Sequence, residues 1–144
     1  MKILFTLMIV AIVITSASFA WAEKTSFGLG VGAQDGDIGF QLRKDYWLGG
    51  DISAITGQAS VFLHNKTTFK VDVDYHFILN PEKPGRFYPL AGLQFAFNSD
   101  SAKFGLNAGG GFNFMLTESK AAFAEAKFVS GKWDGFATMG GIYF

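Results

Sequence analysis

The chain has 144 residues, the length of a single domain, and it carries 12 basic and 12 acidic side chains, so it has no net charge. This balance excludes the basic surface that a nucleic-acid-binding protein needs. The absence of cysteine excludes a disulfide scaffold, while 17 phenylalanines and 18 glycines are unusually many for a soluble domain.

The first 22 residues have the order of a secretory signal peptide. Lys2 is followed by an apolar run over residues 3–14 and then by small residues that end in Ala20-Trp21-Ala22. We therefore predict a Sec-type signal peptide at residues 1–22 and a mature domain at residues 23–144. An uncleaved membrane helix is the alternative, but the strongly apolar part is shorter than the ~20 residues that a spanning helix needs. Cleavage would remove one lysine and no acid, which leaves the mature chain nearly neutral.

After residue 23, polar and apolar residues alternate along most of the chain, which is the pattern of β-strands with two unlike faces. Residues 69–79 show it most clearly, because apolar side chains occupy every odd position and Lys70, Asp72, Asp74 and His76 fall between them. The pattern predicts eight strands, at residues 25–34, 37–44, 46–56, 67–79, 86–97, 102–116, 120–130 and 133–144. Most are longer than the ~5 to 6 residues of a globular strand and match the ~9 to 11 residues of a tilted transmembrane strand.

Turn-forming residues separate these strands, among them Asp35-Gly36, Lys44-Asp45 and Ser130-Gly131. Residues 57–66 are the only long connection expected, although Val61 and Leu63 could extend a strand into it. The sequence therefore predicts an all-β fold, an antiparallel up-and-down transmembrane barrel of eight strands. An even number of strands places both chain ends on the same side, the periplasm.

If the apolar faces contact lipid, the polar faces line the barrel interior. Eight strands enclose a space that side chains can fill, and an unpaired charge in it would be costly. We therefore expect the interior charges to pair and to plug the lumen, with glycines such as Gly28 and Gly30 leaving room for long side chains opposite. The predicted luminal polar network consists of Arg43, Asp51, Lys70, Asp72, Asp74, His76, Lys103, Glu125 and Lys127.

Aromatic side chains are expected near both rims of the barrel, because they favour the interface between lipid and water. The alternative is that they fill the core of a β-sandwich, which rarely places aromatic residues at strand ends. The predicted girdle consists of Tyr46, Trp47, Phe77, Phe87, Phe97, Phe104 and Trp133.

Three segments and the C-terminus resemble the OmpA/OmpX-type superfamily of small outer-membrane barrels. The segments are 88–95 (YPLAGLQF), 104–114 (FGLNAGGGFNF) and 123–128 (FAEAKF), and the chain ends in Gly140-Gly141-Ile142-Tyr143-Phe144. The resemblance implies a monomer in the bacterial outer membrane, in contact with membrane lipid and lipopolysaccharide. It also implies that periplasmic chaperones bind the chain before assembly and that the BAM complex assembles the barrel. The BAM complex would recognise Ile142, Tyr143 and Phe144.

The predicted function is that of an outer-membrane barrel with a non-conducting lumen, in envelope integrity or in surface interactions. Adhesion is disfavoured, because three of the four predicted outer connections are very short. Two other classes stay open. One is a lipid A-modifying enzyme similar to PagL or PagP, and the other is a soluble lipocalin-like barrel whose apolar face lines a cavity.

No set of residues indicates catalysis, a metal or a cofactor. His76 lies two residues from Asp74 on the predicted luminal face, whereas His64 has Ser60 nearby in the predicted outer connection and is the better enzymatic candidate. The last strands lack the His-x-Ser pair of the lipid A deacylases, so we predict a protein that is not an enzyme. Two histidines 12 positions apart, without cysteine, do not indicate a metal site.

Overall fold

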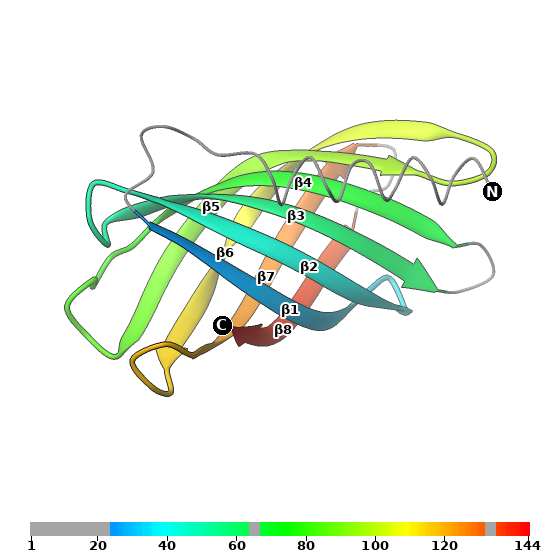
Figure 1. The fold of residues 1–144 in the computed structure, drawn as a ribbon. Coiled ribbons are helices and arrows are strands. Elements are labelled where there is room, and N and C mark those ends of the chain that lie inside the picture. Colours follow the sequence, from blue (N-terminus) through cyan, green and yellow to red (C-terminus); the bar gives the residue numbers. More distant parts are fainter. Residues whose placement is uncertain (1–23, 64–66, 132–134) are drawn as a thin grey trace.

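The computed structural model describes residues 24–63, 67–131 and 135–144. These residues form eight strands, β1 (Lys24–Gln34), β2 (Asp37–Leu48), β3 (Ser53–Leu63), β4 (Thr68–Phe77), β5 (Gly85–Phe97), β6 (Ala102–Met115), β7 (Ala121–Gly131) and β8 (Gly135–Tyr143). Each strand pairs antiparallel with its neighbours in sequence, and β1 pairs with β8, so the sheet closes on itself (Figure 1). The predicted up-and-down barrel of eight strands is confirmed. None of the described residues forms a helix long and apolar enough to cross a membrane.

The first hairpin turns where the sequence predicts it. Asp35 and Gly36 have φ values of 52° and 88°, and a two-residue turn with both φ values positive matches the twist of the flanking strands. Gly36 adopts this conformation without strain because it has no Cβ. Gln34 consequently pairs with Asp37 at the first position of the ladder.

The second connection does not lie where the sequence predicted it. Lys44-Asp45 was expected to form a turn, but β2 continues through both residues to Leu48. Asp45 is 1% exposed and its Oδ1 accepts a hydrogen bond from Thr56 on the neighbouring strand, so it is an interior strand residue. The chain turns instead at residues 49–52, where Gly49 and Gly50 have positive φ. The predicted bounds 37–44 and 46–56 were therefore wrong.

Most of the long connection predicted at residues 57–66 belongs to β3, which pairs with β2 as far as Leu63. The other strands end within two residues of their predicted bounds. With β3 extended, the four connections at one end of the barrel are residues 35–36, 64–67, 98–101 and 132–134, so all four are short.

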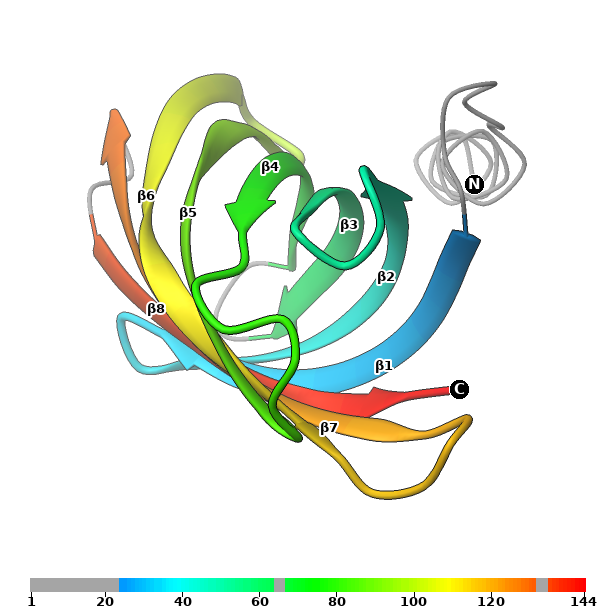
Figure 2. The ribbon, with the colours of Figure 1, turned by 90° about the vertical axis from the view of Figure 1, so that its left-hand side faces the viewer.

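The barrel has two distinct ends. The end of β8 and the start of β1 lie together with connections 49–52, 78–84 and 116–120. This terminal end is on the left in Figure 1 and faces the viewer in Figure 2. The opposite end, which we call the far end, carries the four short connections.

Glycines on the inner face make room for large interior side chains. A Cβ added to Gly28 would lie 3.0 Å from Arg43 Cγ and 2.9 Å from Tyr143 Cδ1. Gly28 thus lets two bulky residues fill the space beside β1. The barrel interior is consequently packed with long polar side chains, where a soluble domain would have an apolar core.

Candidate functional site

The outer wall of the barrel is apolar around its circumference. Side chains alternate between the inside and the outside of each strand, and the outward positions carry most of the exposed large hydrophobic residues. Examples from six strands are Leu29, Phe40, Val73, Phe95, Phe104 and Phe128, with exposed fractions from 44% to 54%. In water this surface would be unfavourable, whereas in hydrocarbon it is expected.

Among the described strand residues, the outward positions carry a single charged side chain, Lys44. Its Nζ lies 5.1 Å from the centroid of the Tyr46 ring, four residues before β2 ends at the terminal end. A lysine can extend its ammonium group toward the membrane surface from such a position. The exposed acids and lysines otherwise lie in the connections at both ends, as at Asp35, Glu82, Lys83, Asp100, Glu118 and Lys120.

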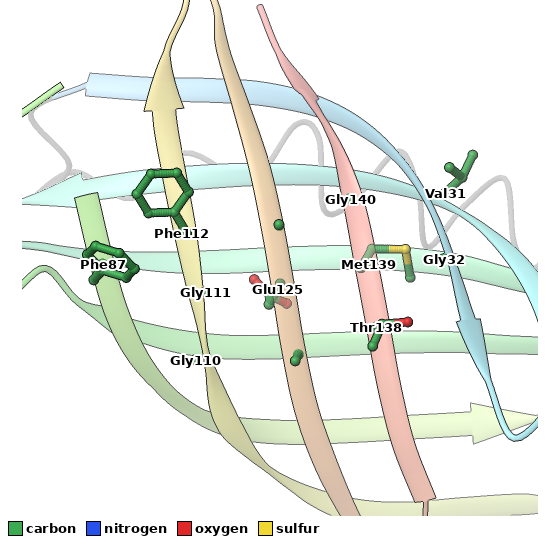
Figure 3. Close-up of a pocket in the computed structure, with 12 residues that line it drawn as sticks. Val31, Gly32, Phe87, Gly110, Gly111, Phe112, Glu125, Thr138, Met139 and Gly140 are labelled. Carbon is green, nitrogen blue, oxygen red and sulfur yellow. The ribbon is translucent and has the colours of Figure 1, made fainter. Parts of the chain in front are cut away.

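The outer wall also contains a hollow of about 530 Å³ over β6, β7 and β8 (Figure 3). Small outward residues form its floor, and Gly110, Ala126 and Thr138 pair in one row across these strands. Phe112 lies on one side of the hollow and Val31 on the other (Figure 3). The outer wall is therefore apolar and has a shallow depression over β6, β7 and β8.

Inside the barrel, Lys127 of β7 joins two carboxylates of β4. Its Nζ lies 2.9 Å from Asp74 Oδ2 and 3.3 Å from Asp72 Oδ1. Asn107 of β6 donates a hydrogen bond of 2.8 Å to each of the same two carboxylates. Gln94 donates to Asp72 at 2.9 Å. Each acid thus has several donors, which offsets the cost of burying it.

A second group of interior residues centres on Glu125 of β7. Its Oε2 lies 3.1 Å from Arg43 Nη1 and accepts a hydrogen bond of 3.1 Å from the Tyr88 hydroxyl. His76 stacks on Tyr88 with ring centroids 4.4 Å apart. Arg43 also lies over the Phe123 ring at 4.4 Å, which adds a cation–π contact. These residues come from β2, β4, β5 and β7, so the group spans the lumen.

Lys70 extends this interior network toward the far end. It donates a hydrogen bond to Gln34 and lies 4.4 Å from the centroid of the Phe62 ring. Between this pair and Lys127 there is a cavity of only about 10 Å³. A single water needs ~10–15 Å³, so side chains fill this part of the interior almost completely.

Two of the predicted luminal residues lie outside this network. Asp51 is in the 49–52 turn and pairs with Arg86 at 3.0 Å, with a third of its side chain exposed. Lys103 is half-buried near the far end. The other seven lie in the interior, namely Arg43, Lys70, Asp72, Asp74, His76, Glu125 and Lys127.

The predicted aromatic girdle is only partly on the outer wall. Trp47 was assigned to it at the start of the strand predicted at 46–56, but Trp47 belongs to β2, faces inward, packs with Ala54, Ile78 and Leu90, and donates a hydrogen bond to Ser26. Tyr46 occupies an outward position, and the Lys44 ammonium group lies over its ring, but the residue is buried. Four predicted members lie on outward positions near the rims, namely Phe77, Phe87, Phe97 and Phe104.

The last three residues take alternate faces. Ile142 is outward and exposed, Tyr143 is buried inside, and the Phe144 N–H donates to the Phe27 carbonyl at 2.8 Å. The predicted signal peptide at residues 1–22, His64 and Trp133 lie outside the described residues.

Several interior polar residues were not predicted from the sequence. Asp45 was placed in a turn, and Thr56, Gln58 and Ser60 were placed in or beside the long connection. Gln58 donates to Asp74 at 3.2 Å and accepts from Lys127 at 3.1 Å, so it belongs to the Lys127 group. The signal was present in the sequence, because polar residues alternate with apolar ones without interruption from Thr56 to Val61.

The interior arrangement does not match a hydrolytic site. The nearest hydroxyl partner recorded for His76 is Thr56 Oγ1, at 3.4 Å from Nδ1, and both side chains are fully buried. Lipid outside the barrel cannot reach a hydroxyl held there. Over the described part of the chain, no group of three or more His, Cys, Asp or Glu residues could hold a metal ion.

No protein-family model and no curated protein sequence matches the chain. Its structure is similar to the N-terminal β-barrel domain of Pseudomonas aeruginosa OprF, with a TM-score of 0.65 and 20% identity over 83% of this chain and 95% of that one. It is also similar to Ail, the attachment invasion locus protein of Yersinia pestis, with a TM-score of 0.57 and 14% identity over 83% and 93%. A third similar structure is the outer membrane enzyme PagL, with a TM-score of 0.53 and 14% identity over 82% and 97%.

These comparisons identify the fold as that of the small outer-membrane barrels of the OmpA/OmpX-like kind. They confirm the resemblance predicted from the sequence at the level of the fold. Because one of the three is an enzyme, the shared fold does not by itself distinguish a structural role from a catalytic one.

Proposed function

We propose that this chain is an integral protein of the bacterial outer membrane, with a closed, non-conducting lumen and a structural role in the cell envelope. The observation that carries the proposal is the segregation of the side chains. One charged residue occupies the outward positions of the described strands, whereas seven acidic and basic side chains lie buried inside with His76.

The segregation supports insertion in lipid. A soluble lipocalin-like barrel would have the opposite arrangement, with apolar residues inside and polar residues in contact with water. Here the interior contains ion pairs and the outer wall is lined with phenylalanine, leucine and valine. The strands have 9 to 14 residues, enough to cross the hydrocarbon layer at a tilt.

Two features support a closed lumen. Lys127 and Arg43 each pair with a carboxylate on another wall, so the network crosses the interior at two levels. The cavity beside Lys127 measures about 10 Å³, too little for a continuous file of water. Moving an ion past these groups would require breaking buried pairs.

The route to the membrane follows from the sequence. We infer export through a Sec-type signal peptide at residues 1–22, passage with periplasmic chaperones, and assembly by the BAM complex acting on Ile142, Tyr143 and Phe144. The assembled barrel is a monomer in contact with membrane lipid and lipopolysaccharide.

The short connections favour a structural role over adhesion, and the burial of His76 disfavours this histidine as a catalytic residue. Only two to four residues separate the paired strands at the far end, which favours envelope integrity over adhesion. His76 lies inside the barrel, out of reach of lipid A, so we infer that it takes no part in catalysis.

Single-cysteine labelling tests the location, because the native chain has no cysteine. Ser99→Cys lies in a far-end connection and Glu82→Cys in a terminal-end connection, and both positions are exposed. An impermeant maleimide should label Ser99→Cys in intact cells and Glu82→Cys only after the outer membrane is permeabilised. Labelling of both positions, or of neither, in intact cells would contradict the proposed topology.

Planar-bilayer recording tests the closed lumen. The purified monomer should insert without producing steady conductance steps, while a porin recorded in the same membrane serves as the positive control. Reproducible open-channel steps from the monomer would overturn the non-conducting lumen.

A further inference from the structure

A cavity opens at the terminal end of the barrel, next to the Glu125 group, because its lining residues Asp45 and Tyr143 both contact Arg43. It measures about 190 Å³ and lies between the ends of β1, β2, β5, β6, β7 and β8 and the 116–120 connection. Its polar lining includes Asp45, Arg86, Asn113 and Tyr143, and its apolar lining includes Trp47 and Met115. Figure 2 looks into this end of the barrel.

Four polar atoms that line this cavity are buried without a hydrogen bond of good geometry, and the Tyr143 hydroxyl lies within reach of the Asp45 carboxylate. Two are acceptors, Asp45 Oδ2 and Asn113 Oδ1, and two are donors, Arg86 Nε and the Tyr143 hydroxyl. Asp45, Asn113 and Tyr143 are each at most 5% exposed. A buried polar atom without a partner costs about 1–3 kcal/mol, so four of them around one cavity indicate that something else binds there.

Asp45 and Arg86 each also have a hydrogen-bond partner outside the cavity. Thr56 donates to Asp45 Oδ1 at 2.8 Å, and Arg86 Nη2 donates to Asp51 at 3.0 Å. Arg43 Nε also lies 3.7 Å from Asp45 Oδ1. These contacts hold the carboxylate and the guanidinium in place, and Asp45 Oδ2 and Arg86 Nε stay available to the cavity. The site is therefore built and oriented by the protein alone.

The size of the cavity argues for more than a single bound water. Water needs ~10–15 Å³, which is the whole volume of the cavity beside Lys127, whereas the terminal cavity is many times larger. Its lining presents groups of both signs, because Glu118 and Lys120 of the 116–120 connection join Asp45 and Arg86, and the uncharged Asn113 and Tyr143 add an acceptor and a donor. A molecule with an ammonium group and a carboxylate would satisfy all four atoms at once.

We propose that this terminal cavity binds a small zwitterion of the α-amino acid class. The ammonium group donates to Asp45 Oδ2 and Asn113 Oδ1, the carboxylate accepts from Arg86 Nε and the Tyr143 hydroxyl, and Trp47 and Met115 contact the carbon atoms. In the proposed topology the cavity opens to the periplasm. Binding does not depend on insertion in a membrane, so its test is separate from the test of the proposed function.

The indole N–H of Trp47 provides a reporter inside the cavity, because Trp47 Nε1 donates to Ser26 Oγ at 3.1 Å and both residues line the site. In detergent-solubilised protein labelled with ¹⁵N at tryptophan, titration with glycine should shift this resonance saturably. The resonance is assigned by its loss in Trp47→Phe. Methylammonium and acetate, each with half of the required groups, should bind at least tenfold more weakly at the same ionic strength.

Two variants and a matched control locate the site. Asp45→Asn removes the charge at constant size, and Asn113→Leu removes the second acceptor and fills the space, so each should weaken glycine binding at least tenfold. Glu82→Gln makes the same carboxylate-to-amide change outside the cavity and should leave binding unchanged. Retention of the folded gel mobility before heating shows that a variant is folded.

Three outcomes would overturn the inference. The first is that glycine causes no saturable shift. The second is that methylammonium or acetate binds as tightly as glycine. The third is that folded Asn113→Leu binds glycine as tightly as the native chain does. The second outcome would show a site for one ion and not for a zwitterion.

Discussion

Lys127 Nζ lies 2.9 Å from Asp74 Oδ2, although β7 and β4, which carry them, share no pairing in the sheet. The contact therefore crosses the barrel interior. Backbone hydrogen bonds join each strand only to its neighbours, so side chains such as these are what connect opposite walls. Asn107 reinforces the connection by donating to Asp74 from β6.

Replacing Lys127 with Met should destabilise the barrel strongly. The substitution keeps the length of the side chain but leaves Asp72 and Asp74 buried without their cation, and breaking a buried pair costs about 3–5 kcal/mol. Urea unfolding in lipid vesicles measures the loss. Lys120→Met, in the exposed 116–120 turn, should change stability by less than about 0.5 kcal/mol. Equal effects of the two variants would show that the ion pair contributes nothing.

Two substitutions around Glu125 should differ in size. Glu125→Gln removes the charge 3.1 Å from Arg43 and should cost about 3–5 kcal/mol. Tyr88→Phe removes only the hydroxyl that donates to Glu125 and should cost about 1.5–3 kcal/mol. The same unfolding experiment compares them, with Glu118→Gln as the exposed control. The reverse order would contradict the assignment of Arg43 as the main partner of Glu125.

Two neighbouring glycines at the β1–β8 closure should respond differently to alanine. A Cβ at Gly141 would lie 2.0 Å from the Leu29 carbonyl oxygen, so the backbone of the closure must shift. Overpacking of this kind costs about 1–3 kcal/mol. At Gly140 the nearest atom in reach is 3.5 Å away, an ordinary contact, and Gly140→Ala should be neutral. The fraction folded after refolding into detergent, read from the gel shift without boiling, checks both. Equal yields would mean that the closure tolerates a side chain at Gly141.

A charge on the outer wall should be costly at mid-height and harmless at the rim. Leu93 points outward near the middle of β5, between Val73 and Leu106, and Leu93→Arg should cost about 2–4 kcal/mol in a bilayer. Ser99→Arg, in the exposed far-end connection, should have little effect. Guanidinium unfolding in phosphatidylcholine vesicles measures the difference. If Leu93→Arg were harmless, the outward faces would not contact hydrocarbon.

The alternation of polar and apolar residues was sufficient to predict the barrel, its strand number and most strand bounds. This follows because neighbouring side chains in a strand point to opposite faces, and lipid outside with polar contacts inside makes the two faces chemically unlike. The same periodicity placed Lys70, Asp72, Asp74 and His76 on one face before any contact was known.

The prediction was wrong where a turn motif and an interior residue look alike in sequence. Lys44-Asp45 resembles a turn, but Asp45 has a donor in Thr56 and continues β2. Trp47 was consequently assigned to the outer girdle although it faces inward, and residues 57–63 of β3 were assigned to a connection. Only the register of β2 against β3 distinguishes the two possibilities, because it decides whether Asp45 reaches a partner.

By itself the sequence determined which face of each strand is polar, because that property follows from residue order within one strand. The tertiary structure alone decided which charges meet, since Lys127 and Asp74 are 53 positions apart and approach only when the sheet closes. It also decided where space remains. The terminal cavity exists because residues from the ends of six strands and one connection surround it, an arrangement that residue order within any one strand does not contain.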